Sequence, residues 1–484
     1  MFPRADPARV AGEHFDLVVV GSGFGSAFFL HRFLERRPTA RALVVEWGDD
    51  HPHDWQIANG RNSAVPFAST FRNESGHPWE YTVALGGGMN CWFAQTPRFH
   101  PSDFRLRTLY GVGQDWPLDY DALEPFYAEA EAVMSVAGDP DMGRVMPRSR
   151  PFPQPPHRLS SVDRAMKAAR PDIHFAMPTA RARLPEAGRG VCCASLRCRL
   201  CPVDAKFTAH NGFRGLFSHP AVTLVLRSEA RRFEPSVPGS VGALVFAHAG
   251  REHRVRGDLF VLGASAVQAP AILHRSGMAD ALTGVGLHES HGTYVEAMLD
   301  GLECFDGGTI TTGLNFGLYD GPFRSDYAAA LLYFENSWTH GLRPEPGRWR
   351  QVLPMMIVTE DLPSDASRVV VDGEGKALVQ GAGRHSDYAR RGQEEAFRKL
   401  PDLLAPLPVE SIHFRRARPT EVHMQGTLRM GDDPATSVVD GGQVHHRWRN
   451  LVAVGTSVFP SCSCANPSLT AAALSLRAAE RLAA

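Results

Sequence analysis

The first fifty residues combine two short apolar runs with a segment whose apolar positions follow a helical spacing. Residues 15–20 (FDLVVV) form a β-branched run typical of a buried parallel strand, and residues 42–48 (ALVVEWG) form a second one. Between them, GSGFGSAFFLHRFLERR places its apolar residues on one face of a helix. The pattern predicts a strand–helix–strand unit with a glycine-rich turn after the first strand.

The remaining chain shows several further groups of elements. Short alternating runs in residues 220–262 predict a β-meander that returns to the first sheet. Strand-like runs in residues 292–375 (TYVEAMLD, QVLPMMIVTEDLP and SRVVVDGEG) predict a separate antiparallel sheet. Residues 386–405 have the pattern of a helix. The C-terminal part predicts a strand at 450–455, a turn, and a helix from about residue 467.

The composition is that of a globular protein large enough for two domains. The chain has 484 residues, of which 43% are hydrophobic and 21% charged, and its net charge is −1. No field of one sign favours nucleic acid or an anionic membrane, and no apolar run reaches the ~18 residues that span a bilayer. The start lacks a signal-peptide pattern. We therefore expect a cytoplasmic protein, or a periplasmic one exported with a partner subunit that carries the signal.

The glycine-rich turn predicts a dinucleotide site. Gly21, Gly23 and Gly25 follow the first strand, where glycines permit a tight turn, close approach of a pyrophosphate, and close packing of helix on strand. The helix N-terminus adds free N–H groups for the phosphates. Glu46 ends the second strand, 25 residues after Gly21, at a position suited to a ribose 2′-hydroxyl. This unit alone does not distinguish NAD from FAD.

A histidine and an asparagine near the C-terminus are candidate catalytic groups. His423 begins the segment HMQGTLRMG, and Asn466 precedes the segment PSLT. Asparagine is a good helix cap and Pro467 suits the first helical position, so Asn466 is expected at a helix N-terminus. A neutral imidazole is well matched to proton abstraction near pH 7, and an amide can orient a substrate oxygen.

Four separated blocks resemble the glucose–methanol–choline (GMC) oxidoreductase family, nearest its pyranose oxidase and bacterial FAD glucose dehydrogenase branches. The blocks are VVVGSGFGSA with Glu46, LGGGMNCWFAQTPRFHPSDF, DLFVLGASAVQAPAILHRSG, and HMQGTLRMG with the NPSLT helix. VGLHESHG (285–292) is similar to a further family element. The resemblance implies an α/β fold with a Rossmann-like FAD-binding domain and a substrate domain built on an antiparallel sheet with helices. The implied FAD-binding domain comprises 1–105, 190–275 and 415–484, and the substrate domain 106–189 and 276–414.

The resemblance also implies roles for single residues. His423 would be the catalytic base, and Asn466 would hold the same substrate oxygen. The implied FAD contacts are Gly21, Ser22, Gly23, Gly25, Glu46, Gly87, Gly88, Asn90, Cys91, Ala264, Gly455, Thr456, Pro467 and Thr470. In pyranose oxidases a histidine near this position carries a covalent flavin link. Here Cys91 occupies the position, so we expect non-covalent FAD.

Four of the eight cysteines lie within ten residues, at positions 192, 193, 198 and 201. They are compatible with a disulfide, with free thiols, or with a zinc site formed by Cys193, Cys198, Cys201 and His210. The spacing Cys193-x4-Cys198-x2-Cys201 also matches the first three ligands of a plant-type iron–sulfur cluster. The catalytic subunits of bacterial FAD glucose dehydrogenases are similar here and hold such a cluster. The resemblance therefore favours an iron–sulfur cluster, with Cys192 or Cys193 as the spare thiol.

Together these features predict a bacterial FAD-dependent dehydrogenase that oxidises an alcohol group, and the resemblance to the nearest branches implies an alcohol of a sugar or glycoside. His423 would take the hydroxyl proton, a hydride would pass to flavin, and the electrons would leave to an acceptor other than O2. The expected partners are the small-molecule substrate and an electron-acceptor or small export or maturation subunit. The alternatives are an oxidase that uses O2, a flavin-dependent lyase or photoenzyme, and an electron-transfer subunit.

Overall fold

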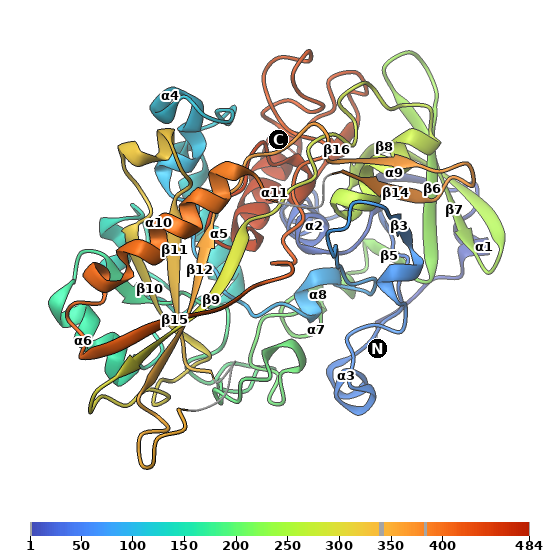
Figure 1. Ribbon diagram of the computed structural model, residues 1–484. Coiled ribbons are helices and arrows are strands. Elements are labelled where there is room, and N and C mark those ends of the chain that lie inside the picture. The colour runs from blue at the N-terminus through green and yellow to red at the C-terminus, as the bar shows by residue number, and fades with distance from the viewer. Residues whose placement is uncertain (1, 338–342, 382–384, 484) are drawn as a thin grey trace.

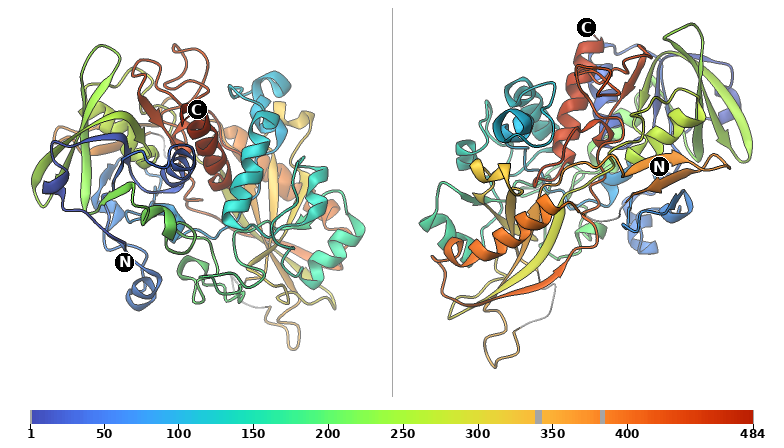
Figure 2. Two further views of the ribbon diagram at one scale, coloured as in Figure 1. Left: turned by 180° about the vertical axis from the view of Figure 1, so that it is seen from behind. Right: turned by 45° about the horizontal axis from the view of Figure 1, so that its top comes forward.

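The computed structural model describes residues 2–337, 343–381 and 385–483. Figure 1 shows two lobes side by side, one containing β6–β8 and the other β9–β12, with helix α11 between them. The two turned views in Figure 2 show the same arrangement. Each lobe is organised around its own sheet. The structure thus has the α/β architecture that the sequence predicts.

The first lobe contains a seven-stranded sheet in the order β5-β2-β1-β8-β7-β6, with β16 also paired to β8. The predicted strand–helix–strand unit is confirmed, since β1 (His14–Val20) lies parallel to β2 (Ala42–Val45) and α2 (Phe24–Arg36) connects them. The predicted meander is confirmed as well, as an antiparallel run of three strands that ends in the central sheet. The other strands of this sheet are β5 (Val222–Val225), β6 (Ser228–Pro235), β7 (Val241–His248), β8 (Arg251–Leu262) and β16 (Leu451–Ala453).

The parallel strands of this sheet end at one common edge. Gly21 follows β1, Glu46 follows β2, Gly263 follows β8, and Gly455 lies two residues after β16. In open α/β sheets, ligands bind outside the carboxyl ends of the parallel strands. The topology therefore brings the predicted dinucleotide residues together, although they are spread over more than 400 residues of sequence.

The last described helix covers the first long one. Helix α11 (Ser468–Ala483) packs against α2 and against α5 (Tyr120–Met134). Its inner face is rich in alanine and leucine, which permits close helix packing. At the outer end Arg36 Nη2 lies 2.5 Å from Glu480 Oε1, and Arg37 Nε donates to the Ala483 carbonyl at 3.3 Å.

The second lobe contains a six-stranded antiparallel sheet in the order β15-β9-β12-β11-β10-β4. Helix α10 (Asp387–Leu403) contacts several of its strands, and apolar clusters pack on both faces of the sheet. The predicted strands near 293–300 and 351–363 are confirmed as β9 and β12. The strands are β4 (His174–Ala176), β9 (His291–Leu299), β10 (Thr311–Leu318), β11 (Ala330–Glu335), β12 (Val352–Thr359) and β15 (Val409–Ala417).

One predicted strand joins a different sheet. The run SRVVVDGEG forms β13 (Arg368–Val371), but it pairs with β14 (Ala377–Gln380), which in turn pairs in parallel with β3 (Phe71–Asn73). Its placement in the antiparallel sheet of the second lobe was therefore a wrong prediction. The physical reason is that its apolar residue Val369 packs with helix α9 (Ser265–Arg275) in a small separate core.

The other helices are short: α1 (Pro7–Val10), α3 (His53–Asn59), α4 (Leu106–Tyr110), α6 (Ser161–Ala169), α7 (Ala209–Gly212) and α8 (Arg214–Phe217). Among the described residues, no helix is long and apolar enough to cross a membrane. The division of the chain into the two predicted sequence-discontinuous domains stays a prediction. β15 spans the predicted boundary at residue 415 and pairs entirely within the second sheet.

A buried ionic network connects the second lobe to the turn that precedes α11. Arg324 is fully buried, and its guanidinium contacts Glu360 Oε1 at 3.0 Å and Asp103 Oδ1 at 2.9 Å. Asp103 Oδ2 also accepts hydrogen bonds from the hydroxyls of Tyr319 and Ser463, both at 2.8 Å. Because the neighbouring carboxylates favour its charged form, the pKa of Arg324 is raised well above its usual value.

Candidate active site

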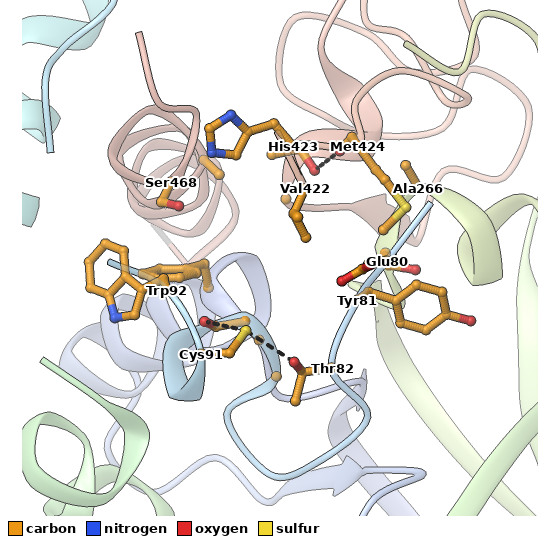
Figure 3. A pocket seen from close by; sticks show the side chains of 18 of the residues that line it. Glu80, Tyr81, Thr82, Cys91, Trp92, Ala266, Val422, His423, Met424 and Ser468 are labelled. Atoms are coloured by element: carbon orange, nitrogen blue, oxygen red, sulfur yellow. Dashed lines mark hydrogen bonds between the residues drawn. The ribbon is translucent and has the colours of Figure 1, made fainter. Parts of the chain in front are cut away.

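A cavity of about 630 Å³ runs from the glycine-rich turn to the two candidate catalytic residues. Figure 3 shows part of its wall, with His423 close to the start of α11 and Cys91 and Thr82 on the opposite side. Twelve of the predicted FAD contacts line it: Gly21, Ser22, Gly23, Gly25, Glu46, Gly87, Gly88, Cys91, Ala264, Gly455, Thr456 and Pro467. His423 and Asn466 line the same cavity.

The three glycines of the turn have different physical roles. A Cβ at Gly21 would lie 2.6 Å from the Gly263 carbonyl oxygen, and one at Gly25 would lie 2.4 Å from the Gly455 nitrogen. Backbone packing therefore requires both of these glycines. At Gly23, by contrast, no described atom lies within 4 Å of a Cβ position, and its φ of −72° suits any residue. Its bare backbone faces the cavity at the N-terminus of α2, as a pyrophosphate site requires. The turn therefore fits the pyrophosphate of a dinucleotide such as FAD.

Glu46 lies at the predicted ribose position but is already hydrogen-bonded within the protein. Its carboxylate accepts from the Ser22 hydroxyl at 2.6 Å and from the Gly48 amide at 2.7 Å. Burial raises the pKa of Glu46, while these hydrogen bonds act in the opposite direction. The Ser22 hydroxyl is also bonded to the amide of Gly86 at 2.9 Å, which links the turn to the second predicted flavin-contacting segment.

Two predicted FAD contacts do not line the cavity. The Asn90 side chain is buried and donates to the Leu85 carbonyl at 2.8 Å, which shapes the turn around Gly87 and Gly88. Thr470 is buried in α11, where its hydroxyl lies 2.7 Å from the Tyr127 hydroxyl. Both side chains point into the protein core instead of facing the cavity.

The two candidate catalytic side chains meet. Asn466 Nδ2 lies 3.4 Å from His423 Nε2. Burial lowers the pKa of His423 to about 4, so its imidazole is neutral at pH 7. Glu289 acts to raise that pKa and Arg418 to lower it, but burial has the larger effect. A neutral imidazole beside an amide donor can take a proton from a substrate hydroxyl and hold the oxygen in place.

Glu289 positions the segment that carries His423. Its carboxylate accepts from the backbone amide of His423 at 2.9 Å and from that of Glu421 at 3.1 Å, and it contacts His77 Nε2 at 2.5 Å. Glu289 is buried, and the pKa of its carboxyl is lowered by the partner His77 and by these amides, which outweigh its desolvation. Sequence reasoning missed this residue, although it lies within the segment VGLHESHG that resembles a family element.

The far wall of the cavity combines aromatic and charged groups. Tyr294 comes from β9 and Met356 from β12, and Arg416 and Arg418 come from β15 and the residues after it. The guanidinium groups of Arg416 and Arg418 lie 5.1 and 5.6 Å from the centre of the Tyr294 ring. Arg418 also bonds to Glu421 at 2.7 Å. This wall offers several donors beside an aromatic face. No periodic pattern in the sequence indicates this wall, because its residues belong to ordinary strands.

The four clustered cysteines are all free thiols. Cys198 is buried, Cys192 and Cys201 are half-buried, and Cys193 is exposed. Within the described ranges, no group of three or more His, Cys, Asp or Glu side chains is arranged to hold a metal ion. The structure thus does not bring the predicted cluster ligands together. His210 of the zinc alternative is instead bonded to Asp50 at 2.6 Å.

Two buried cations lie beside this cysteine segment. Arg181 Nη1 contacts the Cys198 sulfur at 3.5 Å, and its Nε and Nη2 atoms have no hydrogen-bond partner among the described residues. Lys206 is buried, and its Nζ lies within hydrogen-bond distance of four backbone carbonyl oxygens, those of Asn90, Trp92, Cys198 and Arg199. Lys206 thereby ties the cysteine segment to the predicted flavin-contacting turn. Arg199, from the same segment, lines the cavity.

Comparisons with known proteins find similar sequences and a similar fold. Residues 374–475 match the sequence model of the family described as GMC oxidoreductase. The fructose dehydrogenase large subunit of Gluconobacter japonicus is 24% identical over 534 aligned residues, which cover 96% of this chain and 97% of that protein. The 6'''-hydroxyparomomycin C oxidase of Streptomyces lividus is 28% identical over 515 residues, with 98% and 92% coverage.

A solved structure agrees in fold. It is a formate oxidase of Aspergillus oryzae, studied for the modification of its FAD, which superposes with a TM-score of 0.66 at 16% identity and covers 97% of this chain and 98% of that one. The family match and the two full-length relatives agree with the sequence blocks that resemble the GMC family, and the solved structure shares the fold. Residues 374–475 therefore match the GMC oxidoreductase family, and over nearly its whole length the chain is similar to oxidoreductases named for sugar-derived substrates.

Proposed function

We propose that this protein oxidises an alcohol group of a sugar or glycoside, with His423 as the base and FAD held non-covalently in the cavity. The observation that carries the proposal is the contact of His423 with Asn466 on the cavity wall. Gly21, Gly23 and Gly25, here called the glycine cradle, line the same cavity. FAD bound there supplies the acceptor for a hydride and its two electrons.

The residues of the chain perform the remaining steps. His423 Nε2 takes the proton of the substrate hydroxyl, because its imidazole is neutral at pH 7. The amide of Asn466 donates to the same oxygen as negative charge develops on it. Glu289 keeps the backbone of His423 in place, so that the base is pre-organised before the substrate enters.

A polyhydroxylated substrate suits the far wall of the cavity. Arg416 and Arg418 offer donors to hydroxyl oxygens, and Tyr294 offers an aromatic face to the apolar side of a sugar ring. The names of both relatives point to sugar-derived substrates, fructose in one and a hydroxyparomomycin in the other.

An anaerobic screen of sugars, aminoglycosides, polyols and steroids for bleaching of the flavin absorbance tests the proposal. Bleaching by steroids alone would overturn the sugar assignment, and bleaching by no alcohol would overturn the enzyme activity.

Non-covalent flavin is expected because Cys91 on the cavity wall stands where pyranose oxidases carry the linking histidine. The Cys91 sulfur accepts a hydrogen bond from the Thr82 hydroxyl at 3.0 Å. Acid precipitation of the purified protein should therefore release all of the yellow colour into the supernatant as FAD. Cys91→Ser should behave identically. Colour retained in the protein pellet, and lost from the pellet of Cys91→Ser, would contradict this expectation and show a cysteinyl link.

We further propose that the cysteine segment binds an iron–sulfur cluster that serves electron transfer to an acceptor other than O2. The support is the resemblance together with Arg181 and Lys206, two buried cations for which a bound anionic cluster would provide the counter-charge. The thiols do not form a metal-binding group as they are arranged here, so no step of the reaction is assigned to a cluster.

Iron analysis tests this second proposal. Protein purified without air should be brown and contain iron, and Cys198→Ser should lose the iron while keeping FAD. Cys304→Ser is the matched control, because Cys304 is a buried thiol outside the segment. Iron-free yellow protein would overturn the cluster.

Hydrogen peroxide formed in air with substrate would favour an oxidase. One of the two relatives is named as an oxidase. The other relative is named as a large subunit, which supports the expectation of a partner subunit here.

A further inference from the structure

Val422, the residue before His423, has a left-handed backbone although its side chain is branched at Cβ. Its φ is +60°. In this region the Cβ crowds a backbone carbonyl oxygen, so glycine and asparagine are the usual residues and a β-branched residue is an outlier. Such outliers persist where the surrounding structure enforces them, and they gather at functional sites. The conformation of Val422 therefore needs a physical cause and a function.

The cause is the carboxylate of Glu289, which binds the amides on both sides of Val422. The amide of Glu421 donates to Oε1 at 3.1 Å, and the amide of His423 donates to Oε2 at 2.9 Å. Backbone N–H groups that converge on one anion in this way form a concave turn that includes a left-handed residue. The amide of Val422 itself donates to the Thr420 hydroxyl at 2.9 Å. The turn that holds His423 thus imposes the backbone conformation on Val422.

The side chain of Val422 contributes little to the core. It is 41% exposed, whereas its neighbour Met424 is 8% exposed and belongs to an apolar cluster with residues of α9. Val422 lines the cavity, and Figure 3 shows its side chain pointing away from the His423 segment toward the wall that carries Cys91 and Thr82. A glycine would adopt the same turn without steric crowding. The function of the valine side chain therefore lies in the cavity and not in the core.

We propose that Val422 is a specificity-determining residue whose branched side chain limits the room beside the oxidised carbon and so favours primary over secondary alcohols. The inference rests on the proposed function, because it takes His423 as the base. A carbon whose hydroxyl proton goes to His423 and whose hydride goes to FAD must lie between the two.

The direction of the Val422 side chain places its methyl groups at the border of this space. It points from the His423 segment toward Cys91, which is a predicted flavin contact. A secondary alcohol carries a second carbon substituent on the oxidised carbon, and this substituent meets the methyl groups of Val422. A primary alcohol carries a hydrogen atom there instead. Truncation of the valine should therefore admit the secondary alcohol.

The products formed from one polyol measure this selectivity. Glycerol and methyl β-D-glucopyranoside each carry primary and secondary hydroxyls, which give an aldehyde and a ketone respectively on oxidation. The FAD-loaded protein is incubated with each probe and phenazine methosulfate as electron acceptor, and the carbonyl products are derivatised and separated by chromatography. In Val422→Ala the ratio of ketone to aldehyde should rise about tenfold, the usual scale for a small apolar group in a fitted pocket. In Val422→Ile the ratio should fall.

Urea unfolding of the FAD-loaded variants measures the steric crowding separately from catalysis. Val422→Gly should raise the unfolding midpoint, because glycine adopts the left-handed conformation freely, and it should also raise the ratio of ketone to aldehyde. Ala249→Gly is the matched control. Ala249 has a φ of +47°, is exposed in the turn between β7 and β8, and does not line the cavity. Its replacement should raise the midpoint and leave the product ratio unchanged.

The product ratio and the midpoint together decide the inference. A ratio that rises in Val422→Ala and Val422→Gly and stays constant in Ala249→Gly supports it. An unchanged ratio in Val422→Ala overturns it, and so does a lowered midpoint in Val422→Gly, which would show that the valine serves the fold. Loss of FAD or a shifted flavin absorbance in Val422→Ala, with a constant ratio, would show a contact with the flavin instead of the substrate and would also overturn it.

Failure of the proposed function gives a different result. Neither probe would then bleach the flavin of the natural protein, and the inference would fail together with the activity on which it rests. Where the probes do bleach the flavin and the product ratio does not respond to position 422, the proposed function stands and only the inference fails.

Discussion

Replacing His423 with alanine should slow the reduction of bound flavin by the alcohol substrate by about 10²- to 10⁴-fold, the usual contribution of a positioned general base. The imidazole is neutral and its Nε2 lies next to the Asn466 amide, so its removal leaves the hydroxyl proton without an acceptor. FAD should remain bound, because the substitution leaves Gly21, Gly23 and Gly25 on the cavity wall unchanged.

Stopped-flow measurement of flavin bleaching without air checks this result. The FAD content of the variant is determined from its absorbance before mixing. His413→Ala is the control, since His413 lies on β15, bonded to Ser411 and exposed to solvent. If His423→Ala bleaches at a rate close to that of the natural protein, His423 is not the base and the proposed mechanism fails.

Replacing Arg324 with methionine should destabilise the protein by about 3–5 kcal/mol, the typical result of removing one partner from a buried ionic network. Methionine keeps much of the side-chain volume but leaves Asp103 and Glu360 buried without their counter-charge. Asp103 also accepts the hydroxyl of Ser463, so the turn that carries Asn466 should loosen as well.

Urea unfolding of the FAD-loaded protein, followed by tryptophan fluorescence, measures the loss. Arg390→Met is the matched control, because Arg390 forms an exposed ion pair with Asp387 on α10, and its unfolding midpoint should not change. A variant Arg324→Met with the natural midpoint would show that the network contributes no net stability. A lowered midpoint accompanied by slower flavin reduction would connect the network to the catalytic turn.

The sequence was sufficient for elements whose local pattern also determines their partners. The unit β1–α2–β2 was predicted because a glycine turn between a strand and a helix specifies a parallel neighbour. β13 shows where this fails. Its strand-like run SRVVVDGEG correctly predicted a strand, but such a run does not specify which strand pairs with it, and the contact with α9 decided the sheet.

The same limit applies to the site. Gly23 and His423 belong to recognisable sequence segments, so both could be predicted as site residues, and both line the cavity. Asn90 and Thr470 stand in equally recognisable segments, but only the structure shows that their side chains point inward. The left-handed backbone of Val422 could not have been predicted, because a valine has no local preference for that conformation. The carboxylate that imposes it belongs to a residue 134 positions before His423 in the chain.

The packing of α11 on α2 has a consequence for how the protein is made. During synthesis, α2 leaves the ribosome hundreds of residues before the helix that covers it. Until α11 arrives, the apolar face of α2 and the glycine cradle beside it have no native cover, and such exposed surface promotes aggregation. A nascent chain of this protein should therefore depend on chaperones for most of its translation, and cofactor loading should be a late, post-translational event.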